Sequence, residues 1–508
     1  MGKGKILIYD FGTTAVKTVL FDENIQILDV ITTELSYDYP EDRYVEFDAE
    51  TYWEIAVNTA KEIITQNQCQ DSLEIISIAS QAETVIPVDS KGNCLRKAMV
   101  WLDTRAVKEN DDLKNSIDVH SFYHITGLND MDPIWPINKI KWLKNNEPQL
   151  YSDTAKFLLL KDYVLFKLTG EFVTDPSICS FSGYFDIGKK EWSQRLLDIA
   201  ELDANKLPRL EESEEIIGTL RPEVQKMFGL ERPIQVMNGM LDQSGSAIGA
   251  GNIEEGYLTE TTGTVLALAS TIRNLDSLDL HDRVPIVCHG VADKYLALTF
   301  CQTAGILLKW FRDNFCEIEI QEAARSNKDV YDILTEKARP DSINKRLIIL
   351  PHFGGATSPV VNPDASGVIF GLNLDTNKGD IVKGIMESVA FLLKENYTFL
   401  LNNGFHIDKV RSLGGGAKSP FWLQIKSDVL NREFETIESE ESTSRGCAFL
   451  AGKQLGLYDD LGEICRKIKT KDCYRPDPRK VETYEQKYRL YLDLYSSLGE
   501  VFEKSSRY

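Results

Sequence analysis

The amino-acid sequence predicts an α/β protein built from two related domains. The chain has 508 residues, which is too long for a single hydrophobic core. Residues 5–22 have the pattern of a strand, a polar turn and a returning strand. The same pattern recurs at 256–268, so the two halves of the chain begin alike. We therefore predict two domains, 1–250 and 251–508, whose polar turns face one cleft.

The first polar turn carries groups that suit a phosphate chain. A short apolar strand leads to Asp10, and Gly12 lets the backbone turn sharply. Thr13 and Thr14 offer hydroxyl and N–H donors for phosphate oxygens, and Lys17 supplies a cation. Asp10 could hold the metal ion of the phosphate chain. The alternative is an ordinary hairpin whose Asp and Thr residues cap a turn.

Two further segments place polar side chains where strands end, which is where α/β sheets bind ligands. A buried strand at 75–79 is followed by Gln81 and Glu83, and a later segment carries Trp101 and Asp103. We interpret these residues as candidate substrate contacts. The alternative is that the charged residues lie on the surface and that the indole ring is a half-buried packing residue.

A fourth acidic residue follows a strand that begins at residue 234. The strand runs into a glycine turn, and Asp242 and Gln243 open a helix of small residues. Asp242 could simply cap this helix. A carboxylate held rigidly at this position could also act as a general base toward a substrate.

The mid-chain hairpin repeats the donors of the first one, because Gly263 and Thr264 form its tip. Near residue 410 another strand enters a glycine turn and then a helix. Glycines let a backbone approach a flat ligand closely, and a helix N-terminus favours an anion. Plain strand-to-helix packing is the alternative. The residues of this turn are Gly414, Gly415, Gly416 and Ala417.

Composition and charge exclude several classes of protein. The formal charge is −21, and an acidic chain repels phosphate backbones, so we predict no nucleic-acid partner. No apolar run reaches the roughly 20 residues of a membrane span, and the first strand begins too early for a signal peptide. Nine cysteines without a CxxC pair suit reduced thiols, which favours a cytoplasmic protein. His120 and His124 have helical spacing but no further ligands nearby, so we predict a structural role.

Together these motifs resemble the FGGY family of carbohydrate kinases, a branch of the actin-like, Hsp70-like and hexokinase-like ATPases. The match covers nearly the whole chain. The stretch Asp10-Phe-Gly-Thr-Thr resembles the first phosphate motif of the family, and Thr262-Gly-Thr264 resembles the second. The glycine turn at 414–417 is similar to its adenosine motif. Segments 136–146 and 367–387 resemble its two signatures.

The resemblance implies two actin-like (RNase H-like) domains around a central cleft, with the sugar in the first and the nucleotide in the second. It implies Mg-ATP as donor, and a phosphorylated hydroxyl on a small sugar or polyol. Asp242 would be the general base, and Asp10 and Asp242 would hold Mg²⁺. The substrate contacts would be Gln81, Glu83, Trp101, Asp103, Asp242 and Gln243. The ATP contacts would be Asp10, Gly12, Thr13, Thr14, Lys17, Gly263, Thr264, Gly305, Lys309 and 414–417.

The substrate is the least determined part of this interpretation. Glycerol kinases carry Gln-Arg-Glu-Thr where this chain has Gln81-Ala-Glu-Thr84, and a tyrosine where it has Ile134. Familiar xylulokinases carry a histidine near residue 83 that is missing here. Overall spacing, the glycine triplet and the C-terminal tail still favour a pentulose such as xylulose, with glycerol, another polyol or gluconate as alternatives.

Two hypotheses from other classes also fit part of the pattern. An actin-like or Hsp70-like ATPase that acts on a protein partner would share the phosphate motifs but would not need Glu83, Trp101 and Asp242. A sugar sensor without catalysis would bind sugar and transfer no phosphate. The sequence does not determine the oligomeric state, and a homodimer is one of the states it leaves open.

Overall fold

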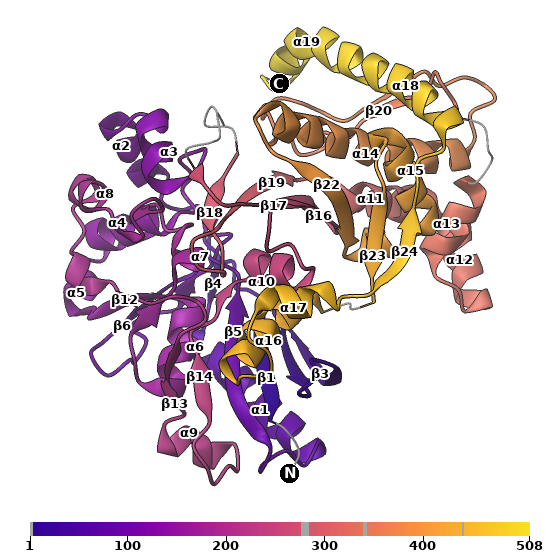
Figure 1. Ribbon diagram of the computed structural model, residues 1–508. Coiled ribbons are helices and arrows are strands. Elements are labelled where there is room, and N and C mark those ends of the chain that lie inside the picture. The colour runs from indigo at the N-terminus through magenta and orange to yellow at the C-terminus, as the bar shows by residue number, and fades with distance from the viewer. Residues whose placement is uncertain (1–3, 276–283, 339–342, 439–440, 508) are drawn as a thin grey trace.

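The computed structural model describes residues 4–275, 284–338, 343–438 and 441–507, and it shows two lobes, each built on a mixed seven-stranded sheet (Figure 1). The first lobe contains the sheet with strand order β13-β14-β5-β1-β2-β3, in which β15 also pairs with β5. Its strands are β1 (Lys5–Phe11), β2 (Ala15–Phe21), β3 (Ile27–Glu34), β5 (Leu73–Ser80), β13 (Ile216–Thr219), β14 (Gln235–Met237) and β15 (Met240–Leu241).

The second lobe contains the sheet with strand order β18-β19-β17-β16-β22-β23-β24. Its strands are β16 (Gly256–Thr262), β17 (Leu266–Ile272), β18 (Ile286–Cys288), β19 (Tyr295–Cys301), β22 (Ile407–Leu413), β23 (Phe434–Ile437) and β24 (Thr470–Tyr474). A two-stranded sheet, β20 (Ile348–Leu350) with β21 (Val368–Phe370), lies in the same half of the chain.

The two sheets repeat one topology. In the first, β1 pairs antiparallel with β2 and parallel with β5, and β2 pairs antiparallel with β3. In the second, β16 pairs antiparallel with β17 and parallel with β22, and β17 pairs antiparallel with β19. Both hairpins predicted from the sequence, β1–β2 and β16–β17, are therefore confirmed, and each opens the corresponding sheet.

Alternation along β1 divides the first lobe into two packed faces, because successive side chains of a strand point to opposite sides. Leu7 and Tyr9 pack with α1 (Ala49–Gln66) and α6 (Leu160–Thr169). Ile6 and Ile8 pack instead with α16 (Ser442–Gln454) and α17 (Leu461–Arg466). Residues 442–466, from the second half of the chain, thus pack against the first sheet. The domain limits 1–250 and 251–508 stay a prediction.

Helix α10 (Asp242–Gly249) crosses α16 at very close range where the two lobes meet (Figure 1). A Cβ atom on Gly249 would lie 1.9 Å from the carbonyl oxygen of Ser442, and one on Gly446 would lie 2.0 Å from that of Gly245. Such distances are impossible for real Cβ atoms, so this crossing requires glycine on both helices. The crossing fixes where α10, and with it Asp242, sits relative to both sheets.

The remaining helices surround the sheets. Helices α14, α15 and α18 pack against one another beside the second sheet (Figure 1). Their bounds, and those of the other helices longer than five residues, are α2 (Val107–Ser116), α3 (Val119–Thr126), α4 (Pro136–Asn146), α5 (Pro148–Asp153), α8 (Gln194–Ala200), α9 (Pro222–Met227), α11 (Gly305–Phe315), α12 (Glu317–Ser326), α13 (Val330–Ala338), α14 (Lys378–Asn402), α15 (Pro420–Leu430), α18 (Pro478–Ser497) and α19 (Gly499–Ser505). A four-stranded sheet in the first lobe has the order β4-β7-β6-β8, with bounds β4 (Glu46–Phe47), β6 (Val85–Val88), β7 (Ala98–Met99) and β8 (Lys156–Leu159).

Two general features bear on the class of protein. Within the described residues, no helix has both the length and the apolar character needed to cross a bilayer. The nine cysteines are all free thiols, and most of them are buried.

Candidate active site

The tip of the first hairpin is a tight turn whose donors remain accessible. The N–H of Gly12 donates to the carbonyl oxygen of Ala15 at 3.0 Å, and the Tyr37 hydroxyl donates to that of Thr13 at 2.8 Å. Thr13 is half-buried and Thr14 is exposed. The hydrogen bonds that hold the tip are therefore accepted by backbone carbonyl oxygens. The hydroxyl groups of Thr13 and Thr14 take no part in them and can bind a ligand.

Asp242 lies close enough to Asp10 to affect the ionisation of Asp10. The pKa of Asp10 is raised to about 7, chiefly by burial and also by the charge of Asp242, while Lys17 lowers it. Burial also raises the pKa of Asp242 to about 7, against the effect of the Gln243 N–H, which donates to its Oδ1 at 2.6 Å. The Asp10 carboxylate accepts no hydrogen bond from the described residues. Two carboxylates that resist ionisation together form a favourable place for a cation.

Lys17 makes an ion pair across the two halves of the chain. Its Nζ donates to both carboxylate oxygens of Glu441, at 2.9 and 2.8 Å. Glu441 immediately precedes α16, so the loop that enters this helix reaches the tip of the first hairpin. Sequence reasoning missed Glu441, because 424 residues separate the two side chains and no motif connects them.

Glu83 belongs to a second group of polar side chains, and its pKa is also affected by the charge of Asp242. Its backbone has a φ of +62°, a conformation that is uncommon for residues with a side chain. The pKa of Glu83 is raised to about 8, chiefly by burial and also by the charges of Asp242 and Asp132, while Lys139 lowers it. Asp242 therefore lies near both Asp10 and Glu83.

Lys139 and two unsatisfied atoms complete this second group. The fully buried Nζ of Lys139 donates to the carbonyl oxygens of Glu83 at 2.9 Å and Val100 at 2.7 Å, which joins the two loops that carry the predicted contacts. The indole Nε1 of Trp101 and the Oε1 of Gln81 are buried without a hydrogen-bond partner among the described residues. Buried polar atoms rarely stay unpaired, so these two atoms suit a ligand that offers hydroxyl groups.

Asp103 is bound by residues of its own loop and of the neighbouring segment. It is fully buried, and its carboxylate accepts hydrogen bonds from Arg105 and, at 2.8 Å, from the Val45 N–H. A carboxylate that is already satisfied in this way has no free lone pair directed at a substrate. Asp103 thus holds the loop that carries Trp101, and its role as a substrate contact stays a prediction.

The second hairpin meets the N-terminus of α11. The Gly305 N–H donates to the carbonyl oxygen of Gly263 at 2.9 Å, and a Cβ on Gly305 would lie 2.3 Å from that oxygen. Thr264 is exposed at the tip. Lys309 is also exposed, one turn farther along the helix, with its Nζ 3.7 Å from Asp313. The structure thus brings Gly263, Thr264 and Gly305 together.

The glycine turn packs on the same hairpin. Gly414 has a φ of +73°, and a Cβ on Gly416 would lie 2.6 Å from the Cβ of Thr262. Beneath this contact lies a fully buried ion pair, in which the Nζ of Lys426 is 2.6 Å from Glu260 and donates to Thr262 Oγ1 at 2.8 Å. Thr262 and Ser412 also donate to the Glu260 carboxylate. Sequence reasoning missed this network.

His120 and His124 lie together on α3, with their Nε2 atoms 3.0 Å apart. Across the described ranges there is no group of three or more histidine, cysteine or acidic residues arranged to hold a metal ion. Their predicted structural role stays a prediction.

Comparison with protein families identifies the chain. Residues 5–249 match the N-terminal domain of the FGGY family of carbohydrate kinases, and residues 261–455 match its C-terminal domain. The chain belongs to the FGGY family of carbohydrate kinases. This membership confirms the resemblance and the two-domain α/β fold predicted from the sequence, and it makes the protein a carbohydrate kinase.

Named relatives of this kinase cover almost its whole length. It is 28% identical to a gluconokinase of Bacillus subtilis, over 97% of this chain and 95% of that protein. It is 28% identical to a xylulose kinase of the same organism, over 96% of each chain. The ligand-bound structure of a xylulose kinase from Lactobacillus acidophilus superposes with a TM-score of 0.89 at 25% identity, covering 99% of both chains.

Proposed function

We propose that this kinase transfers the γ-phosphoryl group of Mg-ATP to a hydroxyl of a small neutral sugar or polyol, with a pentulose such as xylulose as the foremost candidate. The observation that carries the proposal is the position of Asp242. Its carboxylate influences the ionisation of Asp10 in the first hairpin and of Glu83 in the group of predicted sugar contacts. A general base has to stand between the phosphate donor and the attacked hydroxyl in this way.

The residues around Asp10 fit Mg-ATP. Mg²⁺ is usually held by one or two carboxylates, water and phosphate oxygens, and Asp10 and Asp242 supply two carboxylates. When bound, Mg-ATP supplies the transferable phosphoryl group and neutralises part of its charge. Thr13, Thr14 and Lys17 would bind the phosphates from the first lobe.

The second lobe supplies the rest of the nucleotide contacts in this proposal. Gly263 and Thr264 would bind the phosphates from the opposite side, near the N-terminus of α11 that begins at Gly305. The glycine turn at 414–417 would lie along the adenosine, because it has little side-chain bulk and packs on the same hairpin. Lys309 is a more remote candidate contact, since its side chain is already near Asp313.

The first lobe would orient the sugar and accept its proton. Trp101 Nε1 and Gln81 Oε1 offer one unsatisfied donor and one unsatisfied acceptor for sugar hydroxyls. Glu83, whose raised pKa of about 8 keeps it largely protonated at neutral pH, can both donate and accept. Asp242 would take the proton of the attacking hydroxyl as transfer proceeds. Gln243 would hold Asp242 in place, since its N–H already donates to Oδ1.

The charge of this group favours a neutral substrate over an aldonate. Asp242 and Asp132 both raise the pKa of Glu83, and Lys139 directs its Nζ to two backbone carbonyls. A gluconate carboxylate would add another negative charge without a free cation among the described residues of the group. Similarity to the B. subtilis gluconokinase nevertheless makes gluconate the second candidate.

Steady-state assays of ADP release with pentuloses, polyols and aldonates would test the proposal. We expect xylulose or a related pentulose to give the highest kcat/KM, and gluconate to give a value at least roughly tenfold lower because of its charge. Release that required no acceptor would contradict phosphoryl transfer to a sugar. A preference for gluconate would contradict the neutral-substrate proposal. A homodimer stays one of the states that the sequence leaves open.

A further inference from the structure

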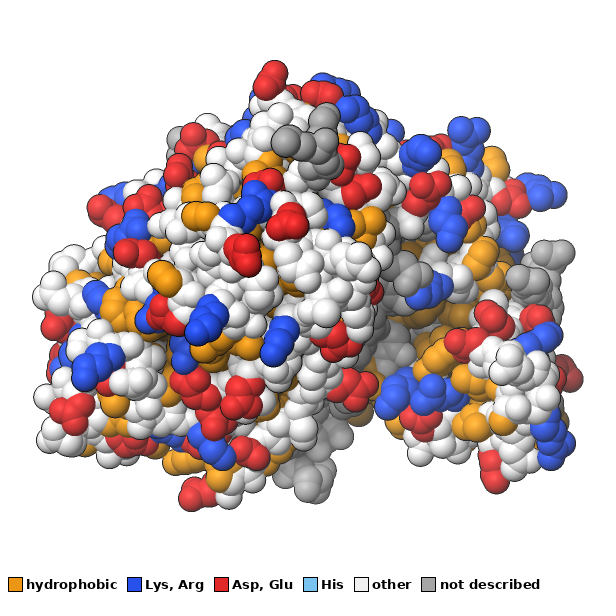
Figure 2. Space-filling model, turned by 90° about the horizontal axis from the view of Figure 1, so that it is seen from below, with side chains coloured by type: hydrophobic (Ala, Val, Ile, Leu, Met, Phe, Trp, Pro, Cys, Tyr) orange, Lys and Arg blue, Asp and Glu red, His pale blue; other side chains and the backbone are white. Residues whose placement is uncertain are grey.

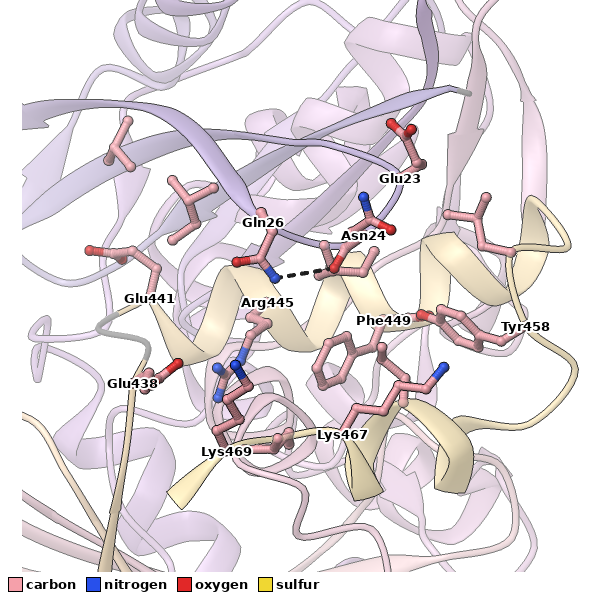
Figure 3. A pocket seen from close by; sticks show the side chains of 16 residues that line it. Glu23, Asn24, Gln26, Glu438, Glu441, Arg445, Phe449, Tyr458, Lys467 and Lys469 are labelled. Carbon is pink, nitrogen blue, oxygen red and sulfur yellow. Dashed lines mark hydrogen bonds between the residues drawn. The ribbon is translucent and has the colours of Figure 1, made fainter. Parts of the chain in front are cut away.

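A cavity of about 840 Å³ opens on the side of the first sheet where α16 and α17 pack (Figure 3). Its walls come from the turn between β2 and β3, from α16 and α17, and from the segment that follows α17. Ile25, Phe449 and Ile464 give it an apolar side. Apart from Glu441, none of its lining residues belongs to the candidate active site, so the cavity is a separate place on the molecule.

Arg445 is a buried cation in the wall of this cavity. Only 9% of the residue is exposed. Its Nε and Nη2 both donate to the carbonyl oxygen of Gly249, with Nε at 2.9 Å. Among the described residues no carboxylate oxygen lies within 4.0 Å of its guanidinium, and its Nη1 makes no hydrogen bond. The guanidinium therefore keeps one N–H edge without a partner among the described residues.

Arg445 is a buried charge without a carboxylate partner among the described residues. The protein has 78 acidic and 57 basic residues, so carboxylates are abundant, yet none of those described pairs with Arg445. The carbonyl of Gly249 at the C-terminal end of α10 offsets part of the charge through the helix dipole. Burial is the main cause that lowers the pKa of Arg445 to about 10, while Cys465 opposes this shift and the nearby Arg411 adds to it. The wall also carries the carboxylates of Glu23, Glu438 and Glu441, of which Glu441 is paired with Lys17.

Lys469 supplies a second cation to the same cavity. It forms no ion pair with any residue in the described ranges. Lys467, two residues earlier, is held by Glu463 at 2.7 Å. Figure 3 shows the Arg445 side chain extending from α16 toward the segment that carries both lysines. Two cations without carboxylate partners therefore line one cavity beside an apolar wall.

We propose that this cavity binds a small phosphomonoester, with its phosphate on Arg445 and Lys469 and its organic body against Phe449 and Ile464. A guanidinium edge matches two phosphate oxygens in a bidentate arrangement, and a lysine ammonium adds a compact charge. The volume exceeds what a free phosphate needs, and the apolar side gives the rest of the ligand a surface to cover.

The site has a direct connection to the predicted ATP contacts. Glu441 lines the cavity and also binds Lys17 of the first hairpin through both carboxylate oxygens. A ligand whose negative charge settles near Glu441 would change how strongly Glu441 holds Lys17. Occupancy of the cavity should therefore alter the apparent affinity for ATP, and this part of the inference rests on the proposed function.

Isothermal titration calorimetry on the full chain tests the binding itself. Inorganic phosphate and phenyl phosphate would be titrated in the presence of saturating ADP, which keeps the predicted nucleotide site filled. We expect phenyl phosphate to bind at one further site, and more tightly than inorganic phosphate because of its ring. Arg445→Met and Lys469→Gln should each weaken this binding roughly tenfold, as expected for loss of a charge-assisted hydrogen bond. Equal affinity for the two probes would mean that the site takes free phosphate and would overturn the phosphomonoester assignment.

Control variants distinguish a specific loss of phosphate binding from a loss caused by misfolding. They also test whether the carboxylates in the wall already neutralise Arg445 and Lys469. Lys467→Gln should leave the binding unchanged, since Lys467 already has a carboxylate partner. Arg445→Lys keeps the charge but loses the bidentate edge, so it should weaken the binding less than Arg445→Met does. Thermal unfolding should show which variants stay folded. Glu438→Gln should tighten the binding, because it removes a carboxylate from the wall. Phosphate binding that no variant changes, or a loss of stability in Glu438→Gln equal to that in Arg445→Met, would overturn the proposal.

The titration also distinguishes this inference from the proposed function. ADP binding is measured first and alone, so a protein that does not bind nucleotide would be recognised at once. Binding of phenyl phosphate to the cavity needs neither the sugar nor turnover. A further assay at subsaturating ATP should then show a change in the apparent KM for ATP on addition of phenyl phosphate, and this change should disappear in Lys469→Gln.

Discussion

The two hairpins share one backbone plan but treat their carboxylates in opposite ways. In the first, Asp10 is half-buried near the tip, lies opposite Lys17 in the β1–β2 pairing and accepts no hydrogen bond from the described residues. In the second, Glu260 is fully buried and satisfied by Lys426, Thr262 and Ser412. The second tip thus presents only backbone and hydroxyl groups.

This difference indicates that the two hairpins have different roles, a division of labour between chemistry in the first lobe and phosphate binding in the second. A carboxylate without a partner and with a raised pKa is suited to a metal ion or to proton transfer. A carboxylate neutralised by a buried lysine is suited to holding a loop in one shape. The first hairpin would therefore take part in the chemistry together with Asp242, whereas the second would only bind phosphate.

The largest expected effect comes from removing the base beside the first hairpin. Asp242→Asn keeps the size of the side chain and should lower kcat by about 10³-fold, within the usual range for a lost general base. ATP affinity, measured by calorimetry, should stay within roughly threefold of wild type, because most predicted nucleotide contacts remain. Turnover near the wild-type rate would remove Asp242 from the mechanism.

The metal dependence of the two hairpins should differ sharply. Asp10→Asn should raise the Mg²⁺ concentration at half-maximal rate and lower kcat by about 10²-fold, because it removes a predicted ligand charge. Glu260→Gln, which alters the buried carboxylate of the second hairpin, should leave the Mg²⁺ dependence unaltered. Titrations of initial rate against Mg²⁺ at saturating ATP would show both. An equal shift in the two variants would contradict the division of labour.

Breaking the buried ion pair between Lys426 and Glu260, beneath the second hairpin, should affect both the stability of the protein and its KM for ATP. Lys426→Met leaves Glu260 buried without its partner, which should destabilise the protein by about 3–5 kcal/mol. Thr262 would also lose the hydrogen bond from Lys426, so the hairpin tip and the glycine turn that packs on it would be held less firmly. The KM for ATP should therefore rise roughly tenfold, with little change in the KM for sugar.

A matched control exists in the same lobe. Lys487 and Glu387 form another buried pair, which joins α18 to α14. Lys487→Met should lower stability by a similar amount and leave the KM for ATP unchanged. If both lysine variants raise this KM equally, the effect of Lys426 is one of general destabilisation and not of positioning.

The smallest effect should come from the contact between the first hairpin and α16. Glu441→Gln removes the carboxylate that holds Lys17, so the positive charge at the tip becomes fully available to phosphate. A partly exposed ion pair is worth about 1 kcal/mol or less, so ATP binding should tighten only a few-fold. Weaker binding in this variant would show that Glu441 orients Lys17 and does not compete with the nucleotide.

The sequence was most informative where a site is built from neighbouring residues. Both hairpins and the glycine turn at 414–417 are continuous stretches, so their turn residues and apolar flanks predict local structure directly. Asp242 was predicted for the same reason, since it follows a strand and opens a helix.

Contacts between distant residues could not be predicted in this way. The pairs Lys17–Glu441 and Lys426–Glu260 are separated by 424 and 166 residues, and nothing in the local pattern connects them. Asp103 shows a different limit. It ends a strand segment beside Trp101, which predicts a substrate contact, but Arg105 two residues later takes its carboxylate. Pairing within Asp103-Thr-Arg105 was visible in the sequence, whereas its burial was not.

The convergence of the two hairpins on one nucleotide is tested most directly by a crystal structure of the full chain with Mg²⁺, a non-hydrolysable ATP analogue and xylulose. We expect its phosphates to contact both Gly12–Thr14 and Gly263–Thr264, and the Asp242 carboxylate to face the terminal phosphate and a sugar hydroxyl. A nucleotide held by one hairpin alone, with Asp242 remote from its terminal phosphate, would contradict that convergence.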